Sequence, residues 1–460
     1  MSTPSPFGGG NFFENLLGDL LKMLATQGPV HWELARQVAQ GVASGGQPEA
    51  NVEPLERIRL EELVRVADLH VADATGLSTT VSGRVVSIQP VTRSEWAWHT
   101  LEAWRPLLDS LARSLSGAPE EPGPGGRPED TPGPGGRPED TPGPGDQGGS
   151  AGLGGLGGLE GLGGLGGLSG LGGPGGPGGP EDPHPMPGWD PDPDQDPSGF
   201  LGQLGQVMGP TLLGLQFGAM VGHLAERAMG QYDLPIPRPA SDQLMMVPAS
   251  IAAFASDWSL PLDDVRLWVC LSEVTHHAIL GRPHVRARLQ ELLEGYAAGF
   301  QHDPSALEDR LADIDPTNPN SLQQALGDPT ALLGELQTPA QRQLLSQLEA
   351  LTAAIEGYVD HVMDSVGHRL ISSYGSLTEA LRRRRVERGE ADRFVERLFG
   401  LELGQAQFDR GAAFVKGVIE RGGEQALSQL WTSARNLPTP AEVEAPGLWL
   451  ERISIPTDDA

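Results

Sequence analysis

Apolar side chains recur every three or four residues through most of this chain, which is the spacing that places them on one face of an α-helix. Before residue 117 three stretches show it, and the third is rich in tryptophan. Val81–Ile88 is instead a candidate strand, although Gly83 interrupts it. We expect a mostly helical region here, with the tryptophans packed in a core or between domains. The helical positions are Phe12, Phe13, Leu16, Leu17, Leu20, Leu21 and Leu24, then Leu60, Leu63, Val66 and Ala67, then Trp96, Trp98 and Trp104.

A long helix is predicted from residue 338 onward. Thr338 and Gln341 stand at the two positions of a capping box, and Pro339 stands at the first helical position. A single apolar stripe then continues to about Leu370. Its members are Leu344, Leu348, Leu351, Ile355, Val359, Val362 and Val366.

A second helix, around Leu271, is apolar on nearly every side, which is typical of a helix buried at the centre of a protein. Gly281 followed by Pro283 predicts where this helix ends. The apolar positions are Leu267, Trp268, Val269, Cys270, Leu271, Val274, Ile279 and Leu280.

Glycine and proline dominate residues 117–199. A ten-residue unit that begins at Pro122 is repeated from Pro132, and a Gly-Gly-Leu run follows. Such a composition cannot offset the entropy of ordering by burying a core. We therefore expect a disordered spacer between a mostly helical N-terminal region, residues 1–116, and a helical domain, residues 200–460. The leucines of the run could also support weak self-association.

Composition limits which partners the protein can bind and in which cellular compartment we expect it. The 460 residues carry a formal charge of −29, which argues against a nucleic-acid partner because phosphate binding needs a basic surface. Cys270 is the only cysteine, so no internal disulfide forms, and the N-terminus lacks a secretory signal. Gly199–Ala225 contains no charged residue, but Gly214, Gly218 and Gly222 are spaced as on a close-packing helix face. We expect a cytoplasmic protein without a membrane span.

The stretch Leu271–His277 differs by one letter from the zinc-binding helix of a metallopeptidase. In that helix, His-Glu-x-x-His, two histidines one turn apart hold Zn²⁺ and the Glu is the general base. Glu273 and His276 occupy the Glu and second His positions, whereas Ser272 stands in place of the first His. The three side chains project from a shared helix face. A buried Glu beside a His is explained either by a metal site or by a structural Glu–His hydrogen bond.

Two further carboxylates, Glu356 and Asp360, lie one turn apart within the long C-terminal helix. In the gluzincin class of metallopeptidases a downstream helix supplies a Glu as third zinc ligand, and an Asp four residues later supports a ligand histidine. Both residues match that pattern in type and spacing. The interval from His276 to Glu356 is longer than in the simplest members of the class.

Several phrases extend this similarity over most of the chain outside the spacer. They are Phe217–Gly222, Gly230–Pro235, Trp268–Ala278, Gly281–Val285, Glu356–Asp364 and Phe399–Leu403. The chain resembles the actinobacterial family of zincin-like proteins that are labelled hydrolases or zinc-dependent metalloproteases. The resemblance implies a mainly α fold with a zincin-like helical core. It also implies Glu273 as the base, His276 and Glu356 as zinc ligands, and Asp360 as support for a ligand.

Position 272 decides what chemistry follows. A serine hydroxyl is a poor zinc ligand beside imidazole or carboxylate. His277, His361 or His284 could replace the missing histidine, although His277 lies about 100° further round the helix than His276. With zinc in place, Glu273 would take a proton from a metal-bound water that attacks a peptide carbonyl.

The sequence is compatible with two functions. One is a divergent zinc-dependent hydrolase that acts on peptides. The other is a catalytically inactive pseudoenzyme, a zincin-fold protein that binds peptide or protein partners.

Overall fold

The computed structural model describes residues 28–80, 82–116, 197–300, 338–386, 390–401 and 404–456. The chain divides into two compact units, and residues 31–111, 213–300 and 333–460 form the unit that contains both cavities described below. The expected helix at Phe12–Leu24 and residues 117–196 of the expected spacer lie outside the described residues.

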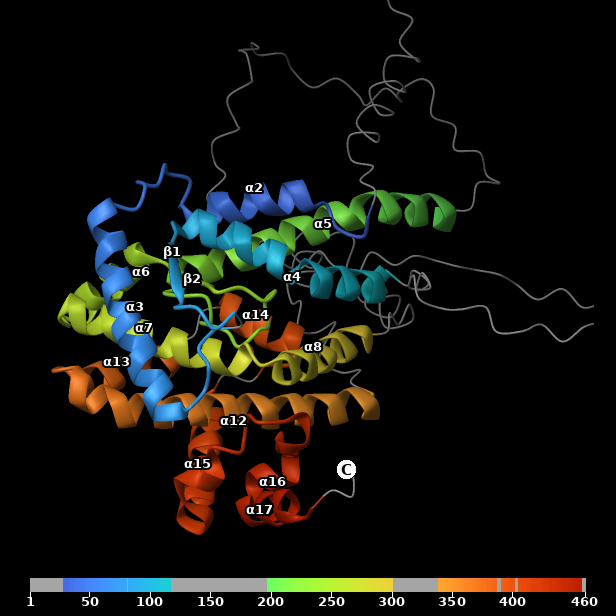
Figure 1. Ribbon diagram of the computed structural model, residues 1–460. Helices are drawn as coiled ribbons and strands as arrows, with labels where there is room; N and C mark the ends of the chain where they lie inside the picture. The colour runs from blue at the N-terminus through green and yellow to red at the C-terminus, as the bar shows by residue number, and fades with distance from the viewer. Residues whose placement is uncertain are drawn as a thin grey trace, which may run out of the picture. The chain divides into compact units, whose positions relative to one another are not determined.

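Helices make up most of the described residues, so the predicted mainly α fold is confirmed (Figure 1). Two short strands are β1 (Ser87–Pro90) and β2 (Gln243–Met246), and Ala434–Asn436 is a single 3-10 turn. The helices are α2 (Trp32–Ala43), α3 (Pro54–Thr75), α4 (Arg93–Ser116), α5 (Pro197–Arg227), α6 (Pro248–Asp257), α7 (Leu262–Leu280), α8 (Pro283–Ala298), α12 (Pro339–Leu370), α13 (Tyr374–Val386), α14 (Glu390–Phe399), α15 (Gln405–Leu427), α16 (Pro440–Glu444) and α17 (Pro446–Ser454).

Helix α7 lies at the centre, as its apolar composition predicts. Every residue from Val269 to Leu280 is buried, and α3, α6, α8 and α12 pack around it. The helix ends at the predicted place. Gly281 keeps a right-handed backbone, whereas Arg282 is extended, because a residue that precedes proline is driven out of the helical region. Pro283 then begins α8.

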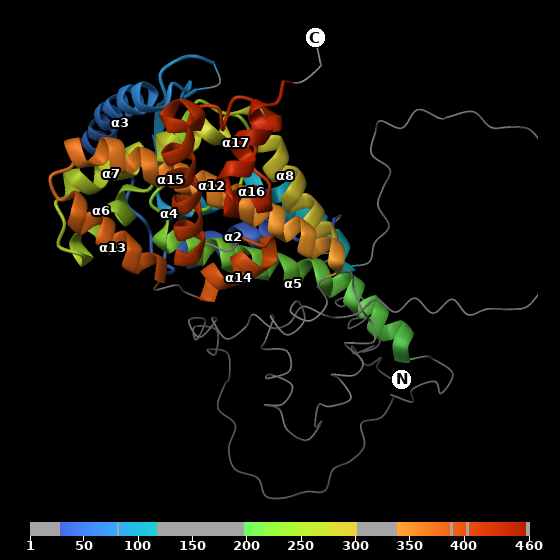
Figure 2. The same cartoon turned by 90° about the horizontal axis from the view of Figure 1, so that it is seen from below.

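Helix α12 begins with the predicted capping box. The Thr338 hydroxyl accepts a hydrogen bond from the Gln341 backbone N–H, and the Gln341 side chain accepts one from the Thr338 N–H. Helix α15 crosses α12 in close contact (Figure 2). At the crossing, a Cβ added to Gly357 would lie 2.2 Å from the Gly411 carbonyl carbon. Two glycines therefore let the backbones touch beside Glu356 and set its position.

The strands form a parallel pair in which Ser87 lies opposite Gln243 and Pro90 opposite Met246. Val81, where the strand was predicted to begin, lies outside the described residues, and the strand begins at Ser87. The chain bends between residues 82 and 84 instead, because Gly83 has a left-handed backbone (φ 74°) and the Thr80 hydroxyl donates to the Arg84 carbonyl.

The glycines of α5 pack against α2, as their spacing predicts. A Cβ added to Gly218 would lie 2.4 Å from the Ala35 carbonyl oxygen, and one on Gly222 would lie 2.6 Å from the Val42 Cβ. Within the described parts of the chain, no helix combines the length and the apolar character that crossing a membrane requires.

Candidate functional site

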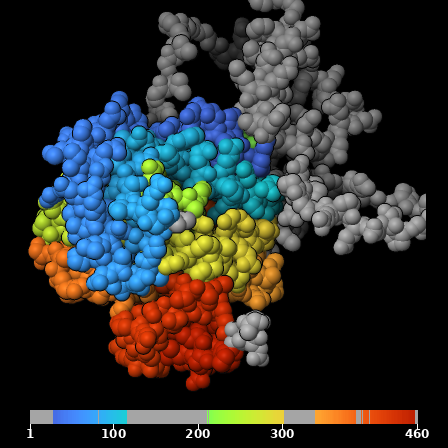
Figure 3. Space-filling model, in the orientation of Figure 1, coloured from blue at the N-terminus to red at the C-terminus, as the bar shows by residue number. Residues whose placement is uncertain are grey.

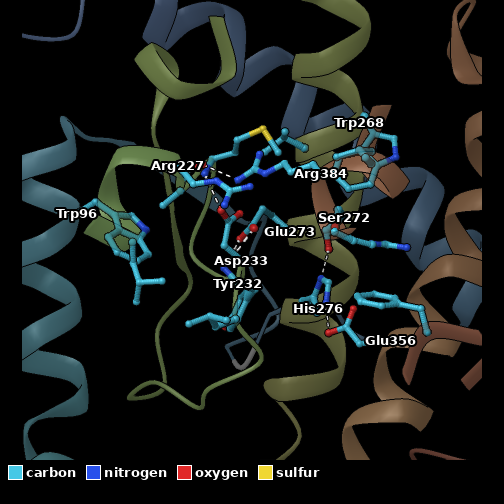
Figure 4. A pocket seen from close by; sticks show the side chains of 18 of the residues that line it. Trp96, Arg227, Tyr232, Asp233, Trp268, Ser272, Glu273, His276, Glu356 and Arg384 are labelled. Atoms are coloured by element: carbon cyan, nitrogen blue, oxygen red, sulfur yellow. Dashed lines mark hydrogen bonds and ion pairs between the residues drawn. The ribbon is translucent and has the colours of Figure 1, made fainter. Parts of the chain in front are cut away.

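A cavity of about 180 Å³ lies beside α7, and we call it the first cavity (Figure 4). Helix α7 supplies Ser272, Glu273 and His276, and α12 supplies Glu356. The segment that follows α5, residues 228–234, forms the facing wall. Two helices that are distant in sequence thus meet at the residues that the sequence singled out.

His276 and Glu356 face each other within this cavity. The Nε2 atom of His276 lies 3.4 Å from Oε1 of Glu356, and both side chains are buried. His276 Nδ1 lies 2.9 Å from the backbone carbonyl of Ser272. Because a carbonyl only accepts hydrogen bonds, Nδ1 carries a proton and Nε2 is the nitrogen presented to Glu356.

Glu273 turns the other way, towards Tyr232 (Figure 4). Its carboxylate accepts the backbone N–H of Gln231 at 2.8 Å and that of Tyr232 at 3.0 Å. The loop can approach this closely because residue 230 is glycine; an added Cβ there would lie 2.3 Å from the Glu273 carboxyl carbon. The Trp96 indole N–H donates to the Gly230 carbonyl at 2.7 Å. Glu273 therefore anchors a loop.

The buried charges of the first cavity perturb one another. Burial lowers the pKa of His276, but the facing Glu356 carboxylate outweighs burial and raises that pKa to about 9. Burial raises the pKa of Glu273 to about 8, and the neighbouring Asp233 carboxylate adds to the rise. His276 and Glu356 are thus held together by a proton on Nε2. A metal ion would have to displace this proton, so binding at Nε2 is weaker at neutral pH than at a histidine whose pKa is not raised.

The other predicted site residues lie elsewhere. His277 packs behind Tyr232, whose hydroxyl lies 2.9 Å from its Nδ1. Asp360 pairs with Arg385 at 3.1 Å. His361 lies 3.2 Å from a Glu424 carboxylate oxygen. His284 lies near Trp431.

His276 and Glu356 have the spacing of two zinc ligands, but a catalytic zinc needs more than two. Two ligands about 2.0–2.1 Å from a tetrahedral zinc stand about 3.3 Å apart, so the 3.4 Å between His276 Nε2 and Glu356 Oε1 suits two ligands of one ion. A catalytic zinc needs a third protein ligand. Among the described residues, no group of three or more His, Cys, Asp or Glu side chains could hold a metal ion. The described residues therefore do not fit a catalytic zinc.

Several cavity residues were missed by the sequence analysis. Arg384 pairs with Asp233 at 3.3 Å and donates to the Arg227 carbonyl at 2.6 Å. The basic run of which Arg384 is part resembles a solvated helix face, so its sequence carries no signal of a cavity. The phrase Gly230–Pro235 did carry a signal, because it belongs to the family resemblance and forms the wall opposite α7.

Comparison with known proteins shows which family the chain belongs to. Residues 30–450 match the zincin-like metallopeptidase family. The chain belongs to that family. No curated protein matches this zincin-like chain at a significant level. A crystal structure from Chloroflexus aurantiacus, described as a "putative hydrolase with a novel fold", is 24% identical, with 93% of this chain and 100% of that chain covered and a TM-score of 0.56. At this identity the likeness concerns the fold alone.

Proposed function

We propose that this zincin-like protein is a non-hydrolytic member of its family and that it binds a peptide segment of a partner in the first cavity. The observation that carries the proposal is the donor set, which stops at His276 and Glu356 among the described residues. Ser272 occupies the place of the missing ligand, and a neutral hydroxyl holds zinc poorly.

The hydrogen bonds of Glu273 also support a non-hydrolytic function. A general base must reach the water from which it takes a proton. Glu273 instead directs its carboxylate at the backbone N–H groups of Gln231 and Tyr232. Releasing it would leave two buried donors without an acceptor, which costs about 1–3 kcal/mol for each group.

The walls of the first cavity suit a peptide. Aromatic side chains of Trp96, Tyr232 and Trp268 lie beside the Asp233–Arg384 ion pair, and such mixed walls are typical of ligand pockets. The Trp268 indole N–H is buried and finds no acceptor among the residues that the structure describes. A peptide carbonyl would supply that acceptor.

A zinc-dependent peptide hydrolase is the competing function. The 3.4 Å separation of His276 Nε2 and Glu356 Oε1 favours it, because this distance suits two ligands of one ion. The two functions differ in whether the natural chain retains zinc.

Metal analysis of the purified full chain tests the proposal. After equilibration with zinc and gel filtration, the wild type should retain far less than one zinc per chain. Ser272→His completes a three-ligand set with His276 and Glu356, so this variant should retain about one zinc per chain. Ser272→Ala is the matched control and should behave as the wild type does.

Adding His276→Ala to Ser272→His should abolish the acquired zinc. Stoichiometric zinc in the wild type, lost on His276→Ala, would instead support the hydrolase, as would chelator-sensitive cleavage of a peptide library.

Peptide binding is tested separately with Trp268→Phe, which removes the indole N–H and keeps a smaller aromatic ring. Peptides selected from a library on the wild type should bind this variant roughly 2- to 10-fold more weakly, the worth of one hydrogen bond. Unchanged affinity would place the peptide outside the first cavity.

A further inference from the structure

A second cavity of about 150 Å³ lies on another side of the loop that follows α5. Helices α4 and α8 form two of its walls, and Figure 3 shows the yellow surface of α8 directly below the teal surface of α4. Residues 236–239 form the third wall. Its lining shares no residue with that of the first cavity.

A buried arginine, Arg238, lines the second cavity. Its side chain donates one hydrogen bond, from Nη2 to the Thr100 hydroxyl at 2.7 Å, and its guanidinium lies 5.6 Å from the centre of the Trp96 ring. Only 8% of the residue is exposed, yet Nε has no acceptor and no carboxylate pairs with the guanidinium among the described residues. A buried cation without a counter-charge is costly, and burial lowers the pKa of Arg238 to about 10.

A second buried donor belongs to the same lining. The Trp104 indole N–H has no acceptor within the described parts of the chain, and the residue is 2% exposed. Buried donors are normally satisfied. Two donors that are unsatisfied among the described residues, Nε–H of Arg238 and the indole N–H of Trp104, belong to residues that line one cavity. Their presence indicates that a hydrogen-bond acceptor binds between them.

The charge of the lining favours an anion. Arg286 of α8 adds a second guanidinium, which makes no ion pair with any described carboxylate. Glu294 is the one acidic residue of the lining, and its carboxylate accepts a hydrogen bond from the Gln290 amide. Two cations and one carboxylate leave a local excess of one positive charge.

We propose that the second cavity binds a small organic monocarboxylate, with its carboxylate at Arg238 and Arg286 and its hydrocarbon part against the apolar wall. Planar guanidinium groups match carboxylates in geometry. Leu107, Ile236 and Leu293 supply apolar surface that inorganic anions would leave unused. The local excess of one positive charge is balanced by a monoanion, whereas a phosphate dianion would leave a net negative charge in the cavity.

This inference goes beyond the proposed peptide binding. The carboxylate site would stand even if the first cavity held zinc, because its ligand contacts residues of a separate lining.

Calorimetric titration of the full chain with propionate, benzoate and inorganic phosphate at constant ionic strength tests the assignment. Propionate or benzoate should bind saturably to one site, and phosphate should bind at least 10-fold more weakly. Arg286→Ala, at a half-buried position, should weaken carboxylate binding at least 10-fold. Glu294→Gln should tighten it severalfold, because the repelling charge is gone.

The matched control is Arg288→Ala, on the same helix. Arg288 pairs with Glu291 at 2.8 Å and with Gln347, and it does not line the cavity, so its loss should leave carboxylate affinity unchanged. Arg238→Met removes the buried guanidinium and should abolish binding, with folding checked by circular dichroism. Three results would overturn the assignment: no saturable carboxylate binding, equal binding by Arg286→Ala and wild type, or phosphate that binds as tightly as propionate.

Discussion

The first and second cavities lie against the same stretch of chain, residues 228–239. They differ in whether their buried charged side chains have partners. In the first cavity, His276 faces Glu356, Glu273 accepts two backbone N–H groups, and Asp233 pairs with Arg384. In the second cavity, Arg238 has no carboxylate partner among the described residues.

The difference shows where a charged ligand is needed. A buried charge that is paired and hydrogen-bonded is stable without a ligand, whereas an unpaired one is not. The first cavity contains His276 and Glu356, the residues that the motif spacing singled out, yet these two side chains already pair with each other. The second cavity contains no residue of the zinc-site motif, yet its two arginines, Arg238 and Arg286, favour binding of an anion. Family membership therefore does not by itself locate the ligand.

The largest effect is expected from Gly230→Ala, because residue 230 belongs to the stretch of chain, residues 228–239, against which both cavities lie. The new Cβ would lie 2.3 Å from the Glu273 carboxyl carbon. The loop must then withdraw, and Glu273 loses its two N–H donors. We expect a loss of roughly 4 kcal/mol or more of unfolding free energy, measured by urea denaturation.

Gly375→Ala is the control for this substitution. An added Cβ at Gly375 meets nothing within 4 Å, and the residue lies inside α13. Alanine should therefore be neutral or stabilising by up to about 1 kcal/mol. Equal destabilisation by the two variants would contradict the close approach of Gly230 and Glu273.

A smaller effect is expected from pH, and it should distinguish the two cavities. Glu356 raises the pKa of His276 from 6.5 to about 9 despite burial. A raised folded-state pKa adds stability that is complete below pH 6.5 and is lost as the pH rises through 9. The wild type should therefore have a higher unfolding free energy than Glu356→Gln, and this difference should be larger at pH 6 than at pH 10 by up to about 3 kcal/mol. The measurement is made with chelator present.

Arg286→Ala should show no such dependence, because Arg286 lines the second cavity and its loss leaves the contact between His276 and Glu356 in place. Parallel stability curves for wild type and Glu356→Gln between pH 6 and 10 would rule out the shared proton between His276 and Glu356.

The smallest effect is expected from Trp96→Phe, at the ring between the cavities. The variant loses the hydrogen bond to the Gly230 carbonyl and weakens the contact with Arg238. We expect a loss of about 1–2 kcal/mol of unfolding free energy and severalfold weaker propionate binding. A change in stability alone would mean that Arg238 does not depend on this ring.

Much of the helical architecture was predictable because its signals are local. The capping box at Thr338 and the proline at residue 283 mark helix ends through contacts between near neighbours. The strand begins at Ser87, later in the chain than its apolar residues predict, because it pairs with β2, about 155 residues away. No local pattern encodes such a pairing.

The candidate site was predictable only in part. The motif spacing predicted that His276 and Glu356 would meet, and they do. The same spacing predicted neither the pairing of Asp360 with Arg385 nor the turn of Glu273 towards the loop at residue 231. Those choices depend on what the neighbouring helices and loops present.

The sequence alone determined a mainly helical protein of zincin-like ancestry with serine at position 272, because helix periodicity and motif letters are properties of nearby residues. Tertiary structure alone decided that Glu273 anchors a loop and that Arg238 is buried with no carboxylate partner among the described residues. Whether a buried charge is paired depends on which atoms distant segments bring within about 3 Å of it, and only the packing of those segments decides that.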